Sequence, residues 1–156
     1  VINKMLANFD RRFTDEMRAE VQENGYTVRD IVIIASMIER ETDGSDRATI
    51  ASVIYNRLNN PNAGTQGYLQ IDATLVYALG RTITSEDYTA DTPYNTYTNK
   101  GLPPGPISNP GLASIQAAMD PENTNYYYYA LGSDGTHSFF QTLEAQQNFI
   151  AQQRGN

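Results

Sequence analysis

The stretch Ile31-Val32-Ile33-Ile34-Ala35-Ser36-Met37-Ile38 is the most apolar in this sequence of 156 residues, and Glu39 follows it directly. A helix needs about 20 apolar residues to cross a bilayer, so this shorter run indicates the core of a globular domain. Thr27 can cap a helix from about residue 28 to residue 42, with Asp30 in its first turn. The sequence therefore predicts a fold built around one central helix.

Two glutamates close this predicted helix. Helical spacing places Glu39 on the stripe that faces the core and Glu41 on roughly the opposite side. We therefore expect Glu39 at the floor of a cleft and Glu41 in water, paired with Arg40 or Arg47. A carboxyl group among apolar side chains tends to keep its proton, because burial disfavours the charged form, and a general acid needs that proton. Glu39 is thus a candidate catalytic acid, the alternative being a glutamate that ends the helix and turns to solvent.

Composition narrows the classes of function. A net charge of −7 and the presence of only two lysines, Lys4 and Lys100, make nucleic acid and anionic membrane surfaces poor partners. The absence of cysteine excludes disulfides and a cysteine nucleophile, and a single histidine, His137, excludes a multi-histidine metal site. Eleven tyrosines suit sugar binding, although the run Tyr126–Tyr129 fits a strand whose rings alternate between core and solvent.

Turn-rich segments separate the other predicted elements. Further helices are expected at residues 2–24, about 46–58, about 73–79, about 110–119 and from 143 onward. Gly25 should end the first of these, and Ser45 and Thr142 should cap two others. Residues 126–131 and 137–141 are expected to pair as a hairpin. The predicted fold class is α+β, a single helical domain packed with a small antiparallel sheet.

Five short blocks follow one another along the chain. They are Ala35–Glu41, Ile50–Leu58, Leu69–Thr74, Pro93–Tyr97 with Gly101–Ile107, and Asn109–Gly111. In this order and spacing they resemble the catalytic domain of MltG-type (YceG-like) endolytic murein transglycosylases, over about residues 28–145. On this resemblance, residues 1–27 form an N-terminal helix that leads into the domain, and residues 28–156 form the YceG-like catalytic domain.

The resemblance implies an activity on peptidoglycan. Such enzymes cleave the β-1,4 bond between N-acetylmuramic acid and N-acetylglucosamine in nascent glycan strands, which leaves 1,6-anhydro-N-acetylmuramic acid ends and terminates the strand. The family's catalytic glutamate closes an Ala-Ser-x-x-Glu pattern, which here ends at Glu39. One carboxylate suffices because the C6 hydroxyl of the substrate attacks the anomeric carbon, whereas ordinary glycosidases need two. The resemblance implies neither a cofactor nor a metal ion.

Seven residues of the blocks are expected to bind the sugar. They are Tyr55, Asn56, Gln70, Asp72, Tyr94, Asn95 and Tyr97. Gln70 and Asp72 alternate with apolar residues, so they can face one cleft and bind sugar hydroxyls or orient Glu39; a structural turn is the alternative. Tyr55 also fits a core position. His137 matches a position in the family's Gly-x-His-x-Phe hairpin, where it is either structural or a binding residue.

The resemblance also implies a cellular setting. Glycan strands are the expected substrate, peptidoglycan synthases the expected partners, and the extracytoplasmic face of the bacterial cell membrane the expected location. The full-length protein should be anchored by a segment that these 156 residues do not include. One departure from the family pattern is Gln146, which stands where a histidine often occurs, nine residues after His137.

Two other classes of function stay open. A non-catalytic peptidoglycan-binding or scaffold module of the cell-wall synthesis machinery would use the same tyrosines without needing an inward Glu39. An aminodeoxychorismate lyase would need a lysine that forms a Schiff base with pyridoxal phosphate. Neither Lys4, near the N-terminus, nor Lys100, in a Gly-Pro segment, suits that role.

Overall fold

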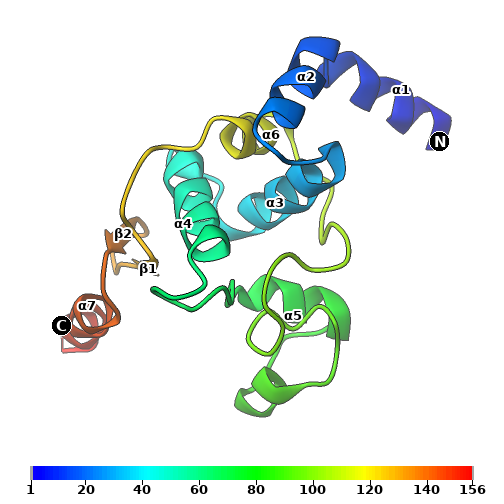
Figure 1. Ribbon diagram of the computed structural model, residues 1–156. Coiled ribbons are helices and arrows are strands. Elements are labelled where there is room, and N and C mark those ends of the chain that lie inside the picture. The colour runs from blue at the N-terminus through cyan, green and yellow to red at the C-terminus, as the bar shows by residue number, and fades with distance from the viewer. Residues whose placement is uncertain (1, 156) are drawn as a thin grey trace.

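The computed structural model describes residues 2–155, apart from the side chains of residues 2, 5 and 6. Its elements are α1 (Ile2–Arg12), α2 (Asp15–Glu23), α3 (Val28–Glu41), α4 (Arg47–Asn59), α5 (Asp72–Leu79), the 3-10 turn η1 (Ser85–Thr89), α6 (Leu112–Met119), β1 (Tyr128–Leu131), β2 (His137–Phe140) and α7 (Leu143–Arg154). Figure 1 shows α1 at one end of the molecule and α7 with the two strands at the other. A mostly helical domain with a small antiparallel sheet confirms the predicted α+β class.

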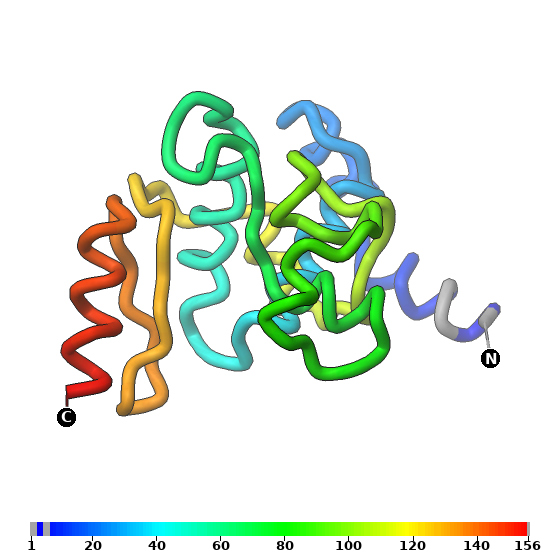
Figure 2. The backbone as a smooth tube through the Cα atoms, turned by 90° about the horizontal axis from the view of Figure 1, so that it is seen from below, coloured from blue at the N-terminus to red at the C-terminus, as the bar shows by residue number. Residues whose placement is uncertain are grey.

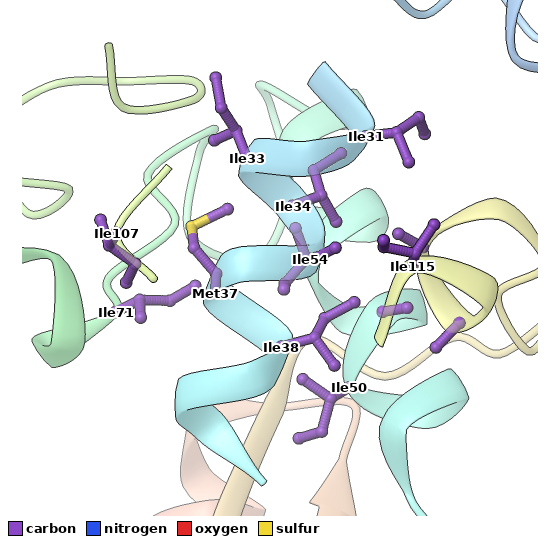
Figure 3. Close-up of a cluster of buried hydrophobic side chains, with 14 of the residues drawn as sticks. Ile31, Ile33, Ile34, Met37, Ile38, Ile50, Ile54, Ile71, Ile107 and Ile115 are labelled. Atoms are coloured by element: carbon purple, nitrogen blue, oxygen red, sulfur yellow. The ribbon is translucent and has the colours of Figure 1, made fainter. Parts of the chain in front are cut away.

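Helix α3 is the centre of the fold. It starts where the sequence predicts, because Thr27 Oγ1 accepts a hydrogen bond from the Asp30 N–H, and Asp30 Oδ2 accepts one from the Thr27 N–H, both at 3.0 Å. Residues 33–38 are buried on every side, and α3 packs most extensively against α6 and α4. Figure 3 shows Ile38 of α3 beside Ile50 of α4 in this core. Between residues 2 and 155 no helix has both the length and the apolar content needed to cross a membrane.

The prediction of one helix over residues 2–24 is wrong. The structure has two helices there, and the break falls at Phe13 and Thr14. Thr14 adopts an extended conformation, and its hydroxyl accepts a hydrogen bond from the Met17 N–H at 3.2 Å. A threonine that caps a new helix removes itself from the preceding one, which explains the break. Phe13 is 1% exposed and anchors the break to the core.

Two other helix starts differ from the prediction. Helix α6 begins at Leu112, with Gly111 as its N-cap, and thus two residues after the expected proline. Helix α4 begins at Arg47, preceded by Asp46, and no side chain caps it. Ser45 therefore does not have the capping role predicted for it. The carboxylate of Asp46 is engaged elsewhere, by side chains that belong to the candidate site.

Polar side chains of α4 hold the extended segment that leads into β1. Four residues of α4 bond residues 122–127: Thr49, Ser52, Asn56 and Arg57. Asn56 Nδ2 alone donates to the carbonyls of Thr124 and Tyr126, at 3.0 and 2.9 Å. Because these bonds fix the position of the chain just before β1, they also determine where the side chain of Tyr129 lies.

Strands β1 and β2 form the predicted hairpin. They pair antiparallel with Tyr129 opposite Phe139, and Gly132 and Thr136 close the turn with a backbone hydrogen bond of 2.8 Å. Figure 2 shows the hairpin lying between α4 and α7. Thr142 caps α7 as predicted, since its hydroxyl accepts a hydrogen bond from the Ala145 N–H at 3.2 Å. The hairpin thus brings residues from late in the sequence next to α4 and the end of α3.

Candidate functional site

Two cavities lie near the C-terminal end of α3, and Glu41 lines both of them. The first, here called the Arg57 cavity, has a volume of about 460 Å³ and is lined by Glu41, Arg57, Gln70, Asp72, Tyr97, Tyr128, Tyr129, Leu143 and Gln146. The second, called the His137 cavity, has a volume of about 610 Å³ and is lined by residues 39–46, Leu131, Gly135, Thr136 and His137. Cavities of similar size lie on the α2 side of the molecule, so chemistry must identify the site.

Glu41 is the ionisable group that both cavities share. Its side chain is half-buried, and Tyr129 Oη donates a hydrogen bond to its Oε2. Burial has the largest effect on the pKa of Glu41 and raises it, and the negative charge of Asp72 raises it further. The Tyr129 hydrogen bond and the positive charges of Arg57 and His137 act in the opposite direction without cancelling the rise. A carboxyl group with a raised pKa in a cavity is suited to hold and donate a proton.

The expectation that Glu41 stays in water beside Arg40 or Arg47 is therefore wrong. Among the side chains that the structure describes, no ion pair within 4.0 Å joins Glu41 to an arginine. Arg47 instead donates hydrogen bonds to the carbonyls of Asp43 and Gly44, at 3.2 and 2.8 Å. The physical reason lies outside α3: the hairpin folds over the last turn of the helix and covers the face that the apolar pattern assigns to solvent.

Glu39 lies in a cleft, as predicted, but in a different setting. It lines the His137 cavity only, while Gln70, Asp72 and Tyr97 line the Arg57 cavity. The hydroxyl of the buried Ser114 donates a hydrogen bond to Glu39 Oε2. The carboxylate also lies beside Gly111, the N-cap of α6, where the helix dipole stabilises a negative charge. Glu39 thus ties α3 to the start of α6.

Arg57 brings a buried positive charge to the first cavity. Its side chain comes from α4 and is only 5% exposed. Nε donates to the carbonyl of Tyr127 at 2.7 Å, and Nη1 donates to the carbonyl of Leu69 at 2.5 Å. The guanidinium carbon lies 5.7 Å from the ring centroids of both Tyr128 and Tyr129. The sequence pattern indicated no functional role for Arg57 or Tyr129. The one available signal was the helical spacing that places Arg57 on the same face as the apolar Ile50 and Ile54.

Three of the seven predicted sugar-binding residues line the Arg57 cavity: Gln70, Asp72 and Tyr97. Gln70 has a φ of 53°, a conformation that costs energy for a residue with a side chain and is often found at functional sites. Asp72 begins α5 and accepts hydrogen bonds from the hydroxyls of Tyr97 and Tyr88, at 2.5 and 3.1 Å. These bonds hold the Asp72 carboxyl group in a fixed position on the cavity wall.

Two predicted asparagines have structural positions instead. Asn95 is completely buried, and its amide donates to the carbonyls of Tyr88 and Ala90, at 3.1 and 3.0 Å. Its Oδ1 accepts a hydrogen bond from the Tyr97 N–H at 2.9 Å, so Asn95 builds the loop that presents Tyr97. Asn56 uses its amide on the segment before β1. Neither side chain lines the Arg57 or the His137 cavity.

The two remaining predicted residues, Tyr55 and Tyr94, also lie outside both cavities. Tyr55 lines a cavity of about 580 Å³ on the α2 side, and its hydroxyl donates to the carbonyl of Ala118 at 2.6 Å. Burial raises the pKa of this hydroxyl further above its usual range. The ring of Tyr94 packs against that of Tyr77, with centroids 5.1 Å apart. Tyr55 is thus half-buried and packs against the edge of the core.

His137 faces the cavity that bears its name. Its Nδ1 lies 2.7 Å from Asp46 Oδ2, and Thr42 Oγ1 donates to Asp46 Oδ1 at 2.6 Å. Burial raises the pKa of Asp46, but the hydrogen bonds from Thr42 and His137 outweigh burial and leave that pKa below its usual value. The imidazole packs edge-on against the ring of Tyr129, with centroids 5.6 Å apart. His137 therefore helps to position the ring of Tyr129, whose hydroxyl donates to Glu41.

The site is built from ionisable and hydrogen-bonding side chains. Within residues 2–155, no group of three or more His, Asp or Glu side chains is placed to hold a metal ion. A carboxyl group with a raised pKa, flanked by tyrosines, amides and one arginine, suits proton transfer to a polyhydroxylated ligand.

Comparisons with known proteins agree with this chemistry. A model of the YceG-like family matches residues 1–152. The chain is 38% identical over 147 residues to a Bacillus subtilis protein named endolytic murein transglycosylase, covering 92% of this chain and 39% of that protein. It is 32% identical over 162 residues to a Streptococcus pneumoniae protein of the same name, covering 97% of this chain and 28% of that protein. The chain thus spans well under half the length of these relatives.

A solved structure is similar as well. The crystal structure of a putative yceG-like protein from Listeria monocytogenes superposes with a TM-score of 0.84 at 39% sequence identity. The match covers 94% of this chain and 48% of that one.

Proposed function

This chain belongs to the YceG-like family, and from that premise we propose that it is the catalytic domain of a lytic transglycosylase that acts on peptidoglycan glycan strands. The bond cleaved is the β-1,4 bond between N-acetylmuramic acid and N-acetylglucosamine, and the product ends are 1,6-anhydro-N-acetylmuramic acid. The observation that carries this proposal is the position of Glu41. It is a carboxyl group with a raised pKa that lines two cavities and accepts a hydrogen bond from Tyr129.

One carboxyl group can carry out both proton transfers of this reaction. Protonated Glu41 gives its proton to the glycosidic oxygen as the bond from that oxygen to the anomeric carbon breaks. The C6 hydroxyl of the same muramic acid then attacks the anomeric carbon, and the Glu41 carboxylate accepts the hydroxyl proton. The new C1–O6 bond closes the anhydro ring, no water is consumed, and Glu41 ends protonated, ready for the next cycle.

The environments of the two glutamates favour Glu41 over Glu39 as this acid. Glu41 is a group whose pKa burial raises, and three predicted sugar-binding residues line one of its cavities: Gln70, Asp72 and Tyr97. Glu39 accepts a hydrogen bond from Ser114 beside the N-terminus of α6, and none of the seven predicted sugar-binding residues lines its cavity. The family resemblance, through its Ala-Ser-x-x-Glu pattern, implies Glu39 instead. The proposal departs from it by two residues because of these environments.

The arrangement of the cavities supports a polymeric substrate. Glu41 lines both cavities, of about 460 and 610 Å³, so the two together offer room for more than one sugar unit near the proposed acid. The proposal places the protein at the extracytoplasmic face of the bacterial cell membrane, acting on nascent strands to terminate them, with peptidoglycan synthases as partners. A scaffold module that only binds peptidoglycan would have no use for a carboxyl group with a raised pKa.

The test is a digestion of uncrosslinked glycan strands with the purified protein, in water labelled with oxygen-18, followed by mass spectrometry. We expect anhydro ends without labelled oxygen, and no product from the Glu41→Gln variant. Reducing ends that carry one labelled oxygen would mean hydrolysis and would rule out the transglycosylase reaction. Binding of the strands without any cleavage would support the scaffold module.

A further inference from the structure

One guanidinium nitrogen of Arg57, Nη2, is not used in a hydrogen bond to the protein residues that the structure describes. Nε and Nη1 are each used by a backbone carbonyl, of Tyr127 and Leu69, whereas Nη2 donates no hydrogen bond to any residue that the structure describes. The side chain is 95% buried, and it lines the Arg57 cavity. Arg47 Nε is the one buried side-chain nitrogen or oxygen without a partner among the described residues, so Nη2 of Arg57 is open to the cavity, where a ligand acceptor can take the place of water.

The guanidinium group is also held rigidly. Two carbonyls fix its plane, and the rings of Tyr128 and Tyr129 lie on it at 5.7 Å. No carboxylate lies within 4.0 Å of it among the described residues. A donor fixed in this way before the ligand arrives loses little conformational entropy on binding.

The surroundings indicate which acceptor suits this donor. Asp72 lines the same cavity, so a ligand carboxylate would be repelled by its negative charge, whereas a neutral carbonyl oxygen would not. Leu143 lines the cavity too and is 48% exposed, which offers an apolar surface beside the polar groups. An acetamido group has both features, since it combines a carbonyl oxygen with a methyl group.

We propose that Arg57 is a specificity-determining residue that binds the acetamido carbonyl oxygen of the sugar in the Arg57 cavity. The cavity would then accept 2-acetamido sugars in preference to sugars with a hydroxyl at the same carbon. This inference rests on the proposed function, because it takes a glycan as the ligand. It assigns Arg57 to recognition of the substrate and leaves proton transfer to Glu41.

The test compares two neutral β-1,4-linked pentasaccharides. The fully N-acetylated chitopentaose, called chitopentaose below, carries an acetamido group at C2 of each sugar, and cellopentaose carries a hydroxyl at the same carbon. Binding is measured by calorimetry to the Glu41→Gln protein, which cannot turn the ligand over, and to the same protein with Arg57→Lys added. Lysine keeps the charge but cannot serve both carbonyls and the ligand. We expect Arg57→Lys to weaken chitopentaose binding roughly ten- to a hundredfold, the effect of one lost charge-assisted hydrogen bond, and to leave cellopentaose binding unchanged.

A spectroscopic measurement covers the case in which Arg57→Lys fails to fold. Chitopentaose labelled with carbon-13 at its acetyl carbonyls should show a downfield shift of one carbonyl resonance when it binds the Glu41→Gln protein. The absence of any such shift on binding would overturn the proposal, as would equal weakening of both ligands by Arg57→Lys. Failure of both ligands to bind at all would instead count against the proposed function itself, and the inference about Arg57 would fall with it.

Discussion

The hydroxyl of Tyr129 donates a hydrogen bond to the carboxyl group of Glu41, although the two residues are 88 positions apart in the sequence. The bond joins the hairpin to the last turn of α3 and places a neutral donor on the group that we propose as the acid. A donor of this kind favours the charged form of a carboxyl group and so lowers its pKa, in opposition to burial. The balance between the two determines the pH range in which Glu41 holds its proton.

Tyr129→Phe removes this donor and leaves the burial in place. The pKa of Glu41 should therefore rise further, and the fall of kcat/KM on the alkaline side should move to higher pH, because the acid keeps its proton longer. Turnover at the optimum should fall roughly ten- to a hundredfold, since the carboxyl group loses its orientation. The pH profiles of both proteins, measured by the release of anhydro ends, decide the matter. A shift of the alkaline limb to lower pH would contradict this account.

Helix α3 shows which features of the fold can be predicted from the sequence and which cannot. Its start at Thr27 and its buried apolar run follow from local patterns, which is why both were predictable. The burial of Glu41 could not be predicted in this way. A helical pattern describes one helix and contains no information about a hairpin, distant in sequence, that packs on it. The register that sets Tyr129 opposite Phe139, and so fixes where its ring lies, depends on the same tertiary contacts.

The motif residues Asn56 and Asn95 show a second limit. A side chain that bonds the backbone and one that bonds a sugar need the same amide, so residue type alone cannot separate the two roles. Only the structure shows that the amides of both residues are already occupied by backbone carbonyls. Gln70, Asp72 and Tyr97 lie in similar blocks and do reach a cavity.

The pair Glu41→Gln and Glu39→Gln separates the two candidate acids. Glu41→Gln should lower turnover by about two to four orders of magnitude, because an amide neither gives nor takes the proton. Glu39→Gln should keep most of the turnover and lose about 0.5–1 kcal/mol of folding free energy, as the negative charge at the start of α6 is removed. Turnover assays and thermal unfolding of both variants give the answer. Loss of turnover in Glu39→Gln alone would return the acid role to Glu39.

The raised pKa of Glu41 also predicts how stability depends on pH. Because the folded state binds this proton more tightly than the unfolded state, the contribution of Glu41 to stability is complete below the ordinary carboxyl pKa of 4.5 and is lost as pH rises through the folded value. Glu41→Gln has no such loss. Its free energy of unfolding, relative to the native protein, should therefore increase with pH above about 4.5 and stay level below it. Urea unfolding at several pH values measures the difference, and a constant offset would speak against the raised pKa.

Asn56→Ala tests the structural position of a predicted binding residue. The carbonyls of Thr124 and Tyr126 would lose their donor, so we expect a loss of about 2 kcal/mol in the free energy of unfolding. Asn60→Ala, at the exposed C-cap of the same helix, is the matched control: its amide makes one solvent-exposed bond, to the carbonyl of Asn56 at 2.9 Å, so stability should change by about 0.5 kcal/mol or less. Chitopentaose affinity, measured well below the melting temperature, should be the same in both variants. A selective loss of affinity in Asn56→Ala would restore a binding role.

Asp72→Asn should act on Glu41 in the direction opposite to Tyr129→Phe. The negative charge of Asp72 raises the pKa of Glu41, so its removal lowers that pKa and moves the alkaline limb of kcat/KM to lower pH. Asparagine can still accept a hydrogen bond from Tyr97 or Tyr88, which preserves much of the local geometry. Turnover at the optimum should therefore fall by less than tenfold, far less than in Glu41→Gln, and the products should remain anhydro ends. The measurement is a pair of pH profiles with mass spectrometry of the products. A loss as severe as that of Glu41→Gln, together with reducing ends in the native digest, would make Asp72 a second catalytic carboxylate of a hydrolase, because two carboxyl groups are needed when water is the nucleophile.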